Sequence, residues 1–404
     1  NTWTCRRLGK DCIGNDQRTP EKSSKLRNIA LFFILLIDFP LTGQVSIRIF
    51  ADSKPSSVIF TVTSGQYVFD TFDGATLLLK KNDQVLLSPY NGRLAVKSVQ
   101  HPAFVTDSVL LSANSADCSF SVTLNGANTT RQSYNGNLKC RPDLGTIVMV
   151  NICNEKEYLA GVVLTEGGSG KNIEFFKTQA VIARTYMYKY PDKHSNDGYN
   201  LCDNTHCQAF KGLTHDTLIK KAVLETNGLV ILDKDSVLII SAFHSNCGGE
   251  TASPEDVWLT KVPYLRKVTD PYCLSSRNAK WEKKVPVTEW NTAIKKLADT
   301  DTLPALSPFI QNSRAAMYKI GSINIPLRDI RGALGLRSTF FSMTPAAENI
   351  VLTGRGYGHG VGLCQEGAMN MAARGFSFAE ILSFYYSDVR VLNIYYARPA
   401  EKVK

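Results

Sequence analysis

Short runs in which apolar and polar residues alternate dominate the chain from about Val45 to Val150. They occupy residues 45–50, 58–62, 95–99, 120–124 and 146–150, with Gly, Asn, Asp and Pro residues between them. A period of two puts the apolar side chains of a strand on one face. The pattern therefore predicts a region built from short β-strands.

A helical spacing of apolar residues replaces this alternation after residue 154. The first such segment, 155–164, is soon followed by the run 167–170 (Gly-Gly-Ser-Gly), and Gly just past a helix is a common stop. The second segment can be capped by Asn172 and is ended by Pro191. Its predicted buried face is Phe176, Ala180, Ala183 and Met187. Further helices are expected at 217–226, 288–297, 367–373 and 378–386, and strands at 229–232 and 237–243.

The first 43 residues have the features of a targeting segment. Lys25 and Arg27 precede the apolar run 29–37, which fits the hydrophobic region of a secretory signal. The run is shorter than the roughly 20 residues that a membrane span needs. The alternative is a buried strand or helix of the mature fold. We favour export, to the periplasm or the cell envelope.

These patterns together predict an α+β fold that is rich in β-strands and has a few helices. The expected parts are a targeting segment (1–43), an N-terminal β-rich region (44–145), the first part of a core (146–276), a small inserted subdomain (277–345) and the second part of the core (346–404).

Composition narrows the possible partners. A hydrophobic content of 44% and a charged content of 20% are typical of a folded globular protein. The net charge of +10 favours an acidic partner, either nucleic acid or an anionic polymer of the cell envelope. Because the sequence has no RNA-binding signature, zinc-finger spacing or long Lys/Arg block, we expect no nucleic-acid partner. The H-E-x-x-H, P-loop and G-x-S-x-G motifs are also absent, which argues against common proteases, kinases and esterases.

Glycine fills alternate positions from Gly354 to Gly362, so one face of an extended run there would carry no side chains. Such a face admits a neighbouring backbone or a flat ligand such as a sugar ring. The other face would carry Arg355, Tyr357 and His359. Spacing alone leaves both alternatives open: a strand packed on its neighbour and a ligand site.

Glu166 is the candidate catalytic carboxylate. It closes the first helix, where the carbonyl end disfavours an anion, and the apolar neighbours at 162–164 would add desolvation. Both effects would keep the carboxyl protonated near neutral pH, as a general acid for glycosidic cleavage requires. The simpler alternative, which spacing alone favours, is a solvated Glu at a helix end.

A short polar loop brings together two imidazoles and two thiols: His194, Cys202, His206 and Cys207. This set is sufficient for a tetrahedral zinc site. The alternative is a Cys202–Cys207 disulfide beside two surface histidines. Elsewhere, Cys118 and Cys140 could form a local disulfide in an exported protein. His244, at a strand end, could bind a ligand or could simply be hydrogen-bonded.

Five stretches resemble, in order, the motifs of the SpoIID/LytB family, which comprises stage II sporulation protein D and the amidase enhancer. They are Glu157–Glu166 (EYLAGVVLTE), Phe176–Tyr186 (FKTQAVIARTY), Ser245–Thr251 (SNCGGET), Gly356–Ala368 (GYGHGVGLCQEGA) and Ile381–Tyr386 (ILSFYY). The chain departs from the family where the usual Ser-Gln-Tyr is Cys364-Gln365-Glu366. It also has Leu164 and Gly167 where the family has Pro and Met near the Glu.

The resemblance implies a lytic transglycosylase of the bacterial cell envelope. Such enzymes cut the β-1,4 bond between N-acetylmuramic acid and N-acetylglucosamine in the glycan strands of peptidoglycan and leave a 1,6-anhydro end. Glu166 falls on the family's catalytic Glu, which would protonate the leaving oxygen and then help to deprotonate the muramoyl 6-hydroxyl, without a second carboxylate. The resemblance also implies a structural zinc ion at the four loop ligands. For substrate positioning we assign Arg184, Tyr186, His359 and Gln365.

Other functions remain alternatives to this prediction. The first is a non-catalytic protein that binds the cell wall and enhances an N-acetylmuramoyl-L-alanine amidase. A second is a zinc-stapled module that binds another anionic polymer. Within the enzyme hypothesis, Glu366 could act as a second carboxylate, which would make a hydrolase possible.

Overall fold

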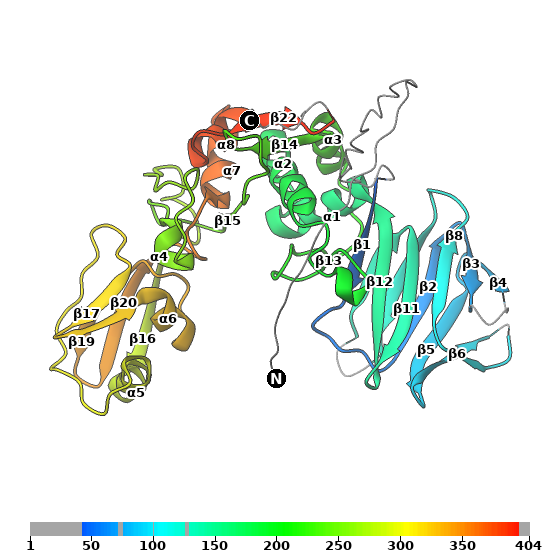
Figure 1. Cartoon of the computed structure of the whole chain (residues 1–404), viewed down its shortest axis with the longest axis horizontal. Helices are drawn as coiled ribbons and strands as arrows, with labels where there is room; N and C mark the ends of the chain where they lie inside the picture. The colour runs from blue at the N-terminus through cyan, green and yellow to red at the C-terminus, as the bar shows by residue number, and fades with distance from the viewer. Residues whose placement is uncertain (1–42, 72–75, 100, 126–128, 396–404) are drawn as a thin grey trace, which may run out of the picture. The chain divides into compact units, whose positions relative to one another are not determined.

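The computed structural model describes residues 43–71, 76–99, 101–125 and 129–395. The targeting segment predicted at 1–43 therefore lies, except for Gly43, outside the described residues. The helices and strands of the described residues confirm the predicted α+β, β-rich fold (Figure 1). Within these residues, no helix is both long enough and apolar enough to cross a membrane.

The described chain up to residue 154 consists mainly of strands, as the alternating pattern predicts. They are β1 (Gln44–Ile49), β2 (Val58–Ser64), β3 (Gln66–Asp70), β4 (Thr76–Lys80), β5 (Gln84–Tyr90), β6 (Arg93–Ser98), β7 (Phe104–Thr106), β8 (Val109–Ala113), β9 (Ser119–Leu124), β10 (Arg131–Asn135), β11 (Asn137–Asp143) and β12 (Thr146–Asn154). One sheet has the order β13-β1-β12-β11-β8-β3-β4, where β13 is Leu201–Cys202, and the other has the order β10-β9-β2-β5-β6-β7.

These two sheets pack against each other through aromatic side chains. Phe60 in β2 and Phe120 in β9 stack with ring centroids 5.1 Å apart. Both rings also make edge-to-face contacts with Tyr67, which belongs to the other sheet, at centroid distances of 5.6 and 5.7 Å. All three side chains are buried, because the period of two turns them to the inner face of their strands. The sheets therefore enclose a hydrophobic core.

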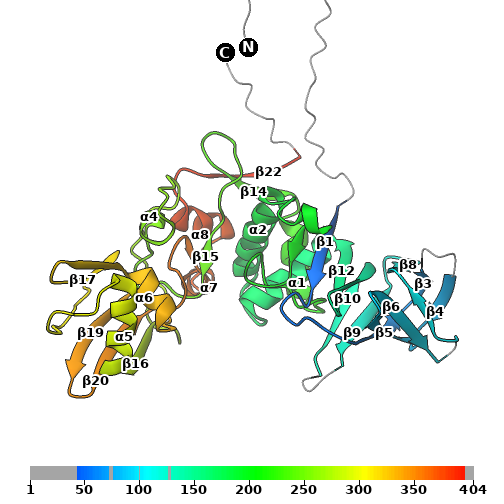
Figure 2. The same ribbon diagram turned by 60° about the horizontal axis from the view of Figure 1, so that its bottom comes forward.

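Three helices follow this β-rich region. Strand β12 runs directly into α1 (Glu155–Gly167), and the side chain of Asn154 caps α1 by accepting a hydrogen bond from the Lys156 N–H. Helix α2 (Ile173–Lys189) is capped in the same way by Asn172, as predicted. Helix α3 (Thr217–Glu225) contacts both α1 and α2, and Figure 2 shows α1 beside β1 and β12. The predicted buried face of α2 is buried. Flanking positions are buried as well, because α2 contacts α1, α3, α7 and α8 on different sides.

The remaining elements of the core are short. They are a 3-10 turn η1 (Ser195–Asp197), β14 (Leu229–Leu232), β15 (Phe243–His244), α4 (Pro254–Trp258), β21 (Leu363–Cys364), α7 (Gln365–Ala373), α8 (Phe378–Tyr385) and β22 (Arg390–Asn393). Strand β14 matches its prediction. The strand predicted at 237–243 is mostly irregular, since only Phe243 lies in a strand, where it begins a two-residue parallel pairing of β15 with β21.

Residues 280–355 form a subdomain with its own hydrophobic core. Its three-stranded sheet has the order β16-β20-β19, and a hairpin and two helices complete it. The elements are β16 (Lys280–Pro286), α5 (Val287–Ala298), β17 (Met317–Ile320), β18 (Ile323–Pro326), α6 (Leu327–Ala333), β19 (Phe341–Ala346) and β20 (Asn349–Arg355). The buried cluster around Trp290 is separate from the main core. Because β20 belongs to this sheet, the subdomain extends past the predicted limit of 345 to Arg355.

The glycine-rich run after β20 is a looping segment, which differs from the predicted extended strand. The φ angles of Gly356, Gly358, Gly360 and Gly362 are 79°, 108°, 85° and 72°, so each lies in the region that favours glycine. A Cβ atom on Gly356 would lie 2.6 Å from the carbonyl oxygen of Asn246, and one on Gly362 would lie 2.2 Å from that of Ala242. The lack of a side chain at these glycines therefore allows a neighbouring backbone segment to pack closely against them. Of the two alternatives, packing explains the glycines.

The predicted disulfide between Cys118 and Cys140 is wrong for this structure. All eight cysteines of the described residues are unpaired. The Cys118 Sγ lies 3.3 Å from the carbonyl oxygen of Gln66. Cys140 is in β11, paired with Val109 of β8. The sequence separation suggested a local staple, but the two side chains lie in different surroundings.

Candidate active site

Glu166 lies in the last turn of α1, held against a later loop. A Cβ atom on Gly161 would lie 2.4 Å from the carbonyl oxygen of Gly212, so glycine lets α1 approach this loop closely. The approach places the N–H of Ala209 2.8 Å from Oε1 of Glu166, to which it donates a hydrogen bond. Gly168, with φ of 71°, ends the helix just after Glu166.

Burial sets the protonation of this carboxyl group. Desolvation raises the pKa of Glu166 above its usual value, and the hydrogen bond from Ala209 opposes this effect only in part. The side chain is half-buried, so the carboxyl can still meet a bound molecule. A raised pKa widens the pH range over which this carboxyl keeps a proton that it can donate.

The carboxyl lines an open groove of about 890 Å³. Its walls come from the end of α1, from α2 and the loop after it, from the segment 240–245, from α4, and from the glycine-rich run with the start of α7. The lining residues are Glu166, Tyr186, Tyr190, Lys193, Thr205, His206, Cys207, Ile240, Ser241, Ala242, Phe243, His244, Ser245, Trp258, Tyr357, His359 and Gln365. Distant parts of the sequence therefore meet around one acid.

Three of the four predicted substrate-positioning residues line this groove: Tyr186, His359 and Gln365. The Tyr186 hydroxyl accepts a hydrogen bond from Nζ of Lys193 at 2.9 Å. Gln365 donates from Nε2 to the main-chain oxygen of Glu166 at 3.1 Å. His359 accepts at Nδ1 from the N–H of Val361, and burial lowers its pKa to about 4, so its ring is neutral.

Arg184 lies away from the groove, which corrects its predicted role in positioning substrate. Its side chain is fully buried. It forms an ion pair with Glu155 at 3.0 Å and donates to the carbonyl oxygens of Thr226 and Val223. These contacts tie α2 to the start of α1 and the end of α3. The guanidinium group is thus part of the packing of the helices.

Glu366 also lies outside the lining of this groove. Its carboxylate accepts hydrogen bonds from Nδ2 of Asn246 at 2.6 Å and from Nδ2 of Asn278 at 2.7 Å. It lines a different cavity, beside Asn172 and Asn370. Among the described residues that line the groove, Glu166 brings the single carboxyl group.

The sequence left the role of His244 open, and in the structure this residue lines the groove and offers a hydrogen-bond acceptor. Its Nδ1 lies 3.1 Å from the carbonyl oxygen of Val361, which fixes Nδ1 as the protonated nitrogen. Its Nε2 is buried and has no hydrogen-bond partner among the described residues. Burial lowers the pKa of this ring well below its usual value, so Nε2 stays an acceptor.

Trp258, Tyr190 and Lys193 line the groove as well but were not predicted from the sequence. Trp258, at the end of α4, lies with its ring centroid 5.6 Å from that of His359 and is partly exposed. Tyr190 and Lys193 follow the end of α2, and the Lys193 ammonium lies over both the Tyr186 and Tyr190 rings. No periodicity or motif marks these positions, because they reach the groove only through the path of the chain.

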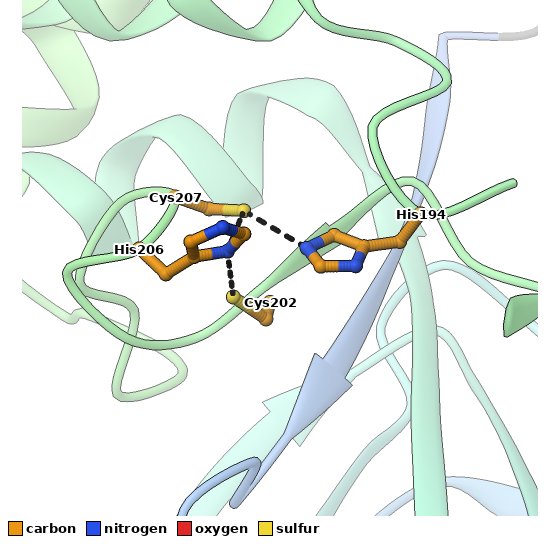
Figure 3. Close-up of side chains that lie close together, drawn as sticks. All are labelled: His194, Cys202, His206 and Cys207. Carbon is orange, nitrogen blue, oxygen red and sulfur yellow. Dashed lines mark hydrogen bonds between the residues drawn. The ribbon is translucent and has the colours of Figure 1, made fainter.

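The four predicted metal ligands converge in one cluster (Figure 3), and two of them, His206 and Cys207, also line the groove. Their ligand atoms all lie within 4.8 Å of one another. Nε2 of His194 lies 3.4 Å from Sγ of Cys207, and Nδ1 of His206 lies 3.8 Å from Sγ of both cysteines. The two thiols, Cys202 and Cys207, are not bonded to each other. Two imidazoles and two thiols at these distances fit a tetrahedral ion.

Other contacts support this donor set. Nδ1 of His194 lies 3.4 Å from a carboxylate oxygen of Asp197, an outer contact that is typical of metal-binding imidazoles. Hydrogen bonding from Cys202, with a further contribution from His194, lowers the pKa of Cys207 to about 4. The loop is anchored to the β-sheet because the Asp203 carboxylate accepts hydrogen bonds from the N–H groups of Phe50 and Ala51.

The fold and the groove define the class: a β-rich α+β protein with one acid in an open, aromatic-lined groove. A family model described as Stage II sporulation protein matches residues 144–232. The chain is 32% identical over 279 residues to an uncharacterised protein of Brachyspira hyodysenteriae, covering 67% of this chain and 74% of that protein. It is 30% identical over 253 residues to Stage II sporulation protein D of Bacillus subtilis, covering 58% of this chain and 74% of that protein. It is also 27% identical over 283 residues to the Amidase enhancer of Bacillus subtilis, covering 56% of this chain and 39% of that protein.

The chain therefore belongs to the SpoIID family. This confirms the family resemblance that its motifs indicate.

Proposed function

We propose that this protein is an exported enzyme of the cell envelope that cleaves the glycan strands of peptidoglycan as a lytic transglycosylase. The observation that carries the proposal is the position of Glu166: a half-buried carboxyl with a raised pKa on the wall of an open groove. A polymer can lie along an open groove, and a protonated carboxyl is the acid that glycosidic cleavage needs.

The reaction uses Glu166 in two steps, first as a general acid and then as a general base. Glu166 donates its proton to the glycosidic oxygen, and the bond between that oxygen and C1 of the N-acetylmuramic acid breaks with the electron pair going to the oxygen. The Glu166 carboxylate then takes the proton of the 6-hydroxyl while O6 bonds to C1. The products are a free 4-hydroxyl and a 1,6-anhydro end, and Glu166 is again protonated.

The single carboxyl favours this route over hydrolysis. Glycosidases that use water require two carboxyl groups roughly 5 to 9.5 Å apart across the bond that is cut. Glu366, the alternative second carboxylate, is bound by Asn246 and Asn278 and does not line the groove. A substrate that supplies its own hydroxyl nucleophile has no need of a second acid.

Neutral polar and aromatic groups would hold the glycan. Tyr357 and Trp258 are 47% and 38% exposed, which leaves ring faces for sugar rings to stack on. His359 and Gln365 can form hydrogen bonds with hydroxyl or acetamido groups. Lys193 brings positive charge to the lining of the groove, which suits the acidic stem peptides of the wall.

A zinc ion at His194, Cys202, His206 and Cys207 would be structural. Four protein ligands complete a tetrahedral shell and leave no open position for substrate. The ion would lock the loop between α2 and α3. The same loop carries Ala209, whose N–H holds the Glu166 carboxyl. Metal binding would therefore stabilise the acid's surroundings.

The test uses purified glycan strands freed of stem peptides, with products identified by mass spectrometry. We expect 1,6-anhydro ends from the wild type and a loss of about 10²- to 10⁴-fold for Glu166→Gln, the usual contribution of a general acid. Glu366→Gln is the matched control and should retain activity. Reducing ends as the main product, or full activity in Glu166→Gln, would contradict the proposal.

The alternative is a non-catalytic enhancer that binds the wall and stimulates an amidase, since one relative is named Amidase enhancer. Glu166→Gln separates the two functions. An inert wild type whose Glu166→Gln variant still stimulates an N-acetylmuramoyl-L-alanine amidase would support the enhancer. Binding of glycan strands without cleavage by Glu166→Gln, together with cleavage by the wild type, supports the enzyme.

A further inference from the structure

We infer that Cys247, Asp270, Cys273 and Cys364 form a second metal site, which holds one tetrahedral divalent ion inside the core. The four residues come from three separate segments: the loop after β15, the turn before β16, and the residue that caps α7. All four side chains are fully buried. Their ligand atoms lie within 4.8 Å of one another.

The distances fit a single ion. Sγ of Cys247 lies 3.3 Å from Sγ of Cys273 and 3.2 Å from Oδ2 of Asp270. In a tetrahedral zinc site, with zinc–sulfur bonds of about 2.3 Å, two sulfur ligands lie about 3.8 Å apart. The Cys247–Cys273 pair therefore needs to lengthen by only about half an ångström to hold such an ion. Three thiols and one carboxylate are a donor set that suits zinc.

Main-chain N–H groups point at the sulfur atoms as they do around thiolate ligands. The N–H of Cys247 donates to Sγ of Cys364 at 3.2 Å, and the N–H of Gly249 donates to Sγ of Cys273 at 3.3 Å. The N–H of Gly367, in the first turn of α7, donates to Sγ of Cys364 at 3.4 Å. Such bonds stabilise sulfur that carries negative charge.

The carboxylate is also oriented by its surroundings. Oδ1 of Asp270 accepts a hydrogen bond from the N–H of Tyr272 at 2.8 Å. Oδ2, the oxygen that faces Cys247, accepts one from the Tyr385 hydroxyl at 3.0 Å. A Cβ atom on Gly367 would lie 2.4 Å from this oxygen, so glycine is needed for the approach. A buried carboxylate held in this way is typical of a ligand with an outer shell.

A metal ion explains the cluster better than a disulfide does. A Cys247–Cys273 disulfide would remove the Cys247 thiol that lies against Oδ2 of Asp270, and it would use only two of the three thiols that converge there. The buried guanidinium group of Arg314 donates to the carbonyl oxygens of Cys247 and Glu250. An anionic metal–thiolate centre next to Arg314 would balance this buried positive charge.

This site would fasten the start of α7, and with it Gln365, to the two preceding segments. The inserted subdomain leaves the core shortly after Cys273 and returns to it shortly before Cys364. An ion bound to both residues would hold the two ends of that insertion together. The inference rests on the cluster alone and is independent of any activity toward glycan.

Counting the zinc ions bound by the full-length protein tests the inference. Protein purified with zinc under reducing conditions is desalted, and its metal content is measured by inductively coupled plasma and native mass spectrometry. Cys202→Ser removes the first cluster, so this variant should keep one ion. Adding Cys364→Ser should reduce the count to zero, whereas adding Cys140→Ser, a buried cysteine outside both clusters, should leave it at one.

Two results would overturn the inference. One is a Cys202→Ser protein that is folded by circular dichroism and binds no zinc. The other is a Cys247–Cys273 disulfide in peptides mapped from unreduced wild-type protein. If Cys202→Ser does not fold, His194→Ala is the milder background. If neither variant folds, the wild-type count decides: two ions support the site, and fewer overturn it.

Discussion

Gln365 donates a hydrogen bond to the main-chain oxygen of Glu166 at 3.1 Å, across 199 positions of the sequence. The same amide group lies 3.4 Å from Oε1 of Gln179 in α2. On the other side, the N–H of Ala209 holds the Glu166 carboxyl. The end of α1 is thus fixed between the start of α7 and a loop. The position of the acid depends on both contacts.

Gln365→Ala should slow glycan cleavage by about 10- to 100-fold, because even a small misplacement of a catalytic group is costly. The acid itself remains, so cleavage should not be abolished. Rates on purified glycan strands measure the effect. Gln84→Ala, at an exposed position in β5, is the matched control and should cleave at the wild-type rate. An unchanged rate in a folded Gln365→Ala protein would show that this contact does not position the acid.

The rate of cleavage should fall as pH rises through the raised pKa of Glu166, since only the protonated carboxyl can act as the acid. The falling limb of kcat/KM should therefore lie above the usual Glu pKa of about 4.3. A pH profile on soluble glycan measures this limb. The pH profile of Glu366→Gln should have the same falling limb. A limb that moves in this variant would show that Glu366, and not Glu166, is the group that titrates.

Glu166 should also make stability depend on pH. Its pKa is raised in the folded state. Below the pKa of the unfolded state, both states hold the proton, so Glu166 does not lower the free energy of unfolding. Stability then decreases as pH rises from the unfolded pKa through the folded pKa. Glu166→Gln lacks this loss, so urea denaturation should find it more stable than wild type at neutral pH and equal to it in acid. Equal stability at every pH would mean that burial of Glu166 costs nothing.

Arg184→Met should destabilise the protein by about 3 to 5 kcal/mol, because it leaves Glu155 buried without its partner. The double variant Arg184→Met/Glu155→Gln should recover part of that loss, since it removes both charges. Urea denaturation of the wild type, the two single variants and the double variant gives the coupling. Additive losses would show that the ion pair contributes nothing beyond its separate groups.

Local pattern was enough to predict the elements around the acid. The cap at Asn172, the end of α1 near Glu166 and the buried face of α2 depend on residues close in sequence, and all are present. The loop ligands are close in sequence too, so their convergence was predictable from His194 to Cys207. Such features need no knowledge of tertiary structure.

Features that depend on tertiary packing were not predictable. The burial of Arg184 results from three helices that meet around α2, and a motif position gives no sign of it. The convergence of Cys247, Cys273 and Cys364 needs three separate segments of the chain to fold together. The alternating glycines from 354 to 362 suggested one extended run, but the positive φ angles of Gly356, Gly358, Gly360 and Gly362 turn the chain after β20, and Tyr357 and His359 line the groove.

Removing zinc from the loop cluster should loosen the surroundings of Glu166. His194→Ala, or a strong chelator, should lower stability by several kcal/mol and slow glycan cleavage, because binding energy at a structural site is folding energy. Thermal melting and metal content measure both effects in one sample. His215→Ala, at an exposed position, is the matched control and should keep its metal and its melting temperature. A His194→Ala protein that lost metal yet melted like the wild type would show that the ion does not support the fold.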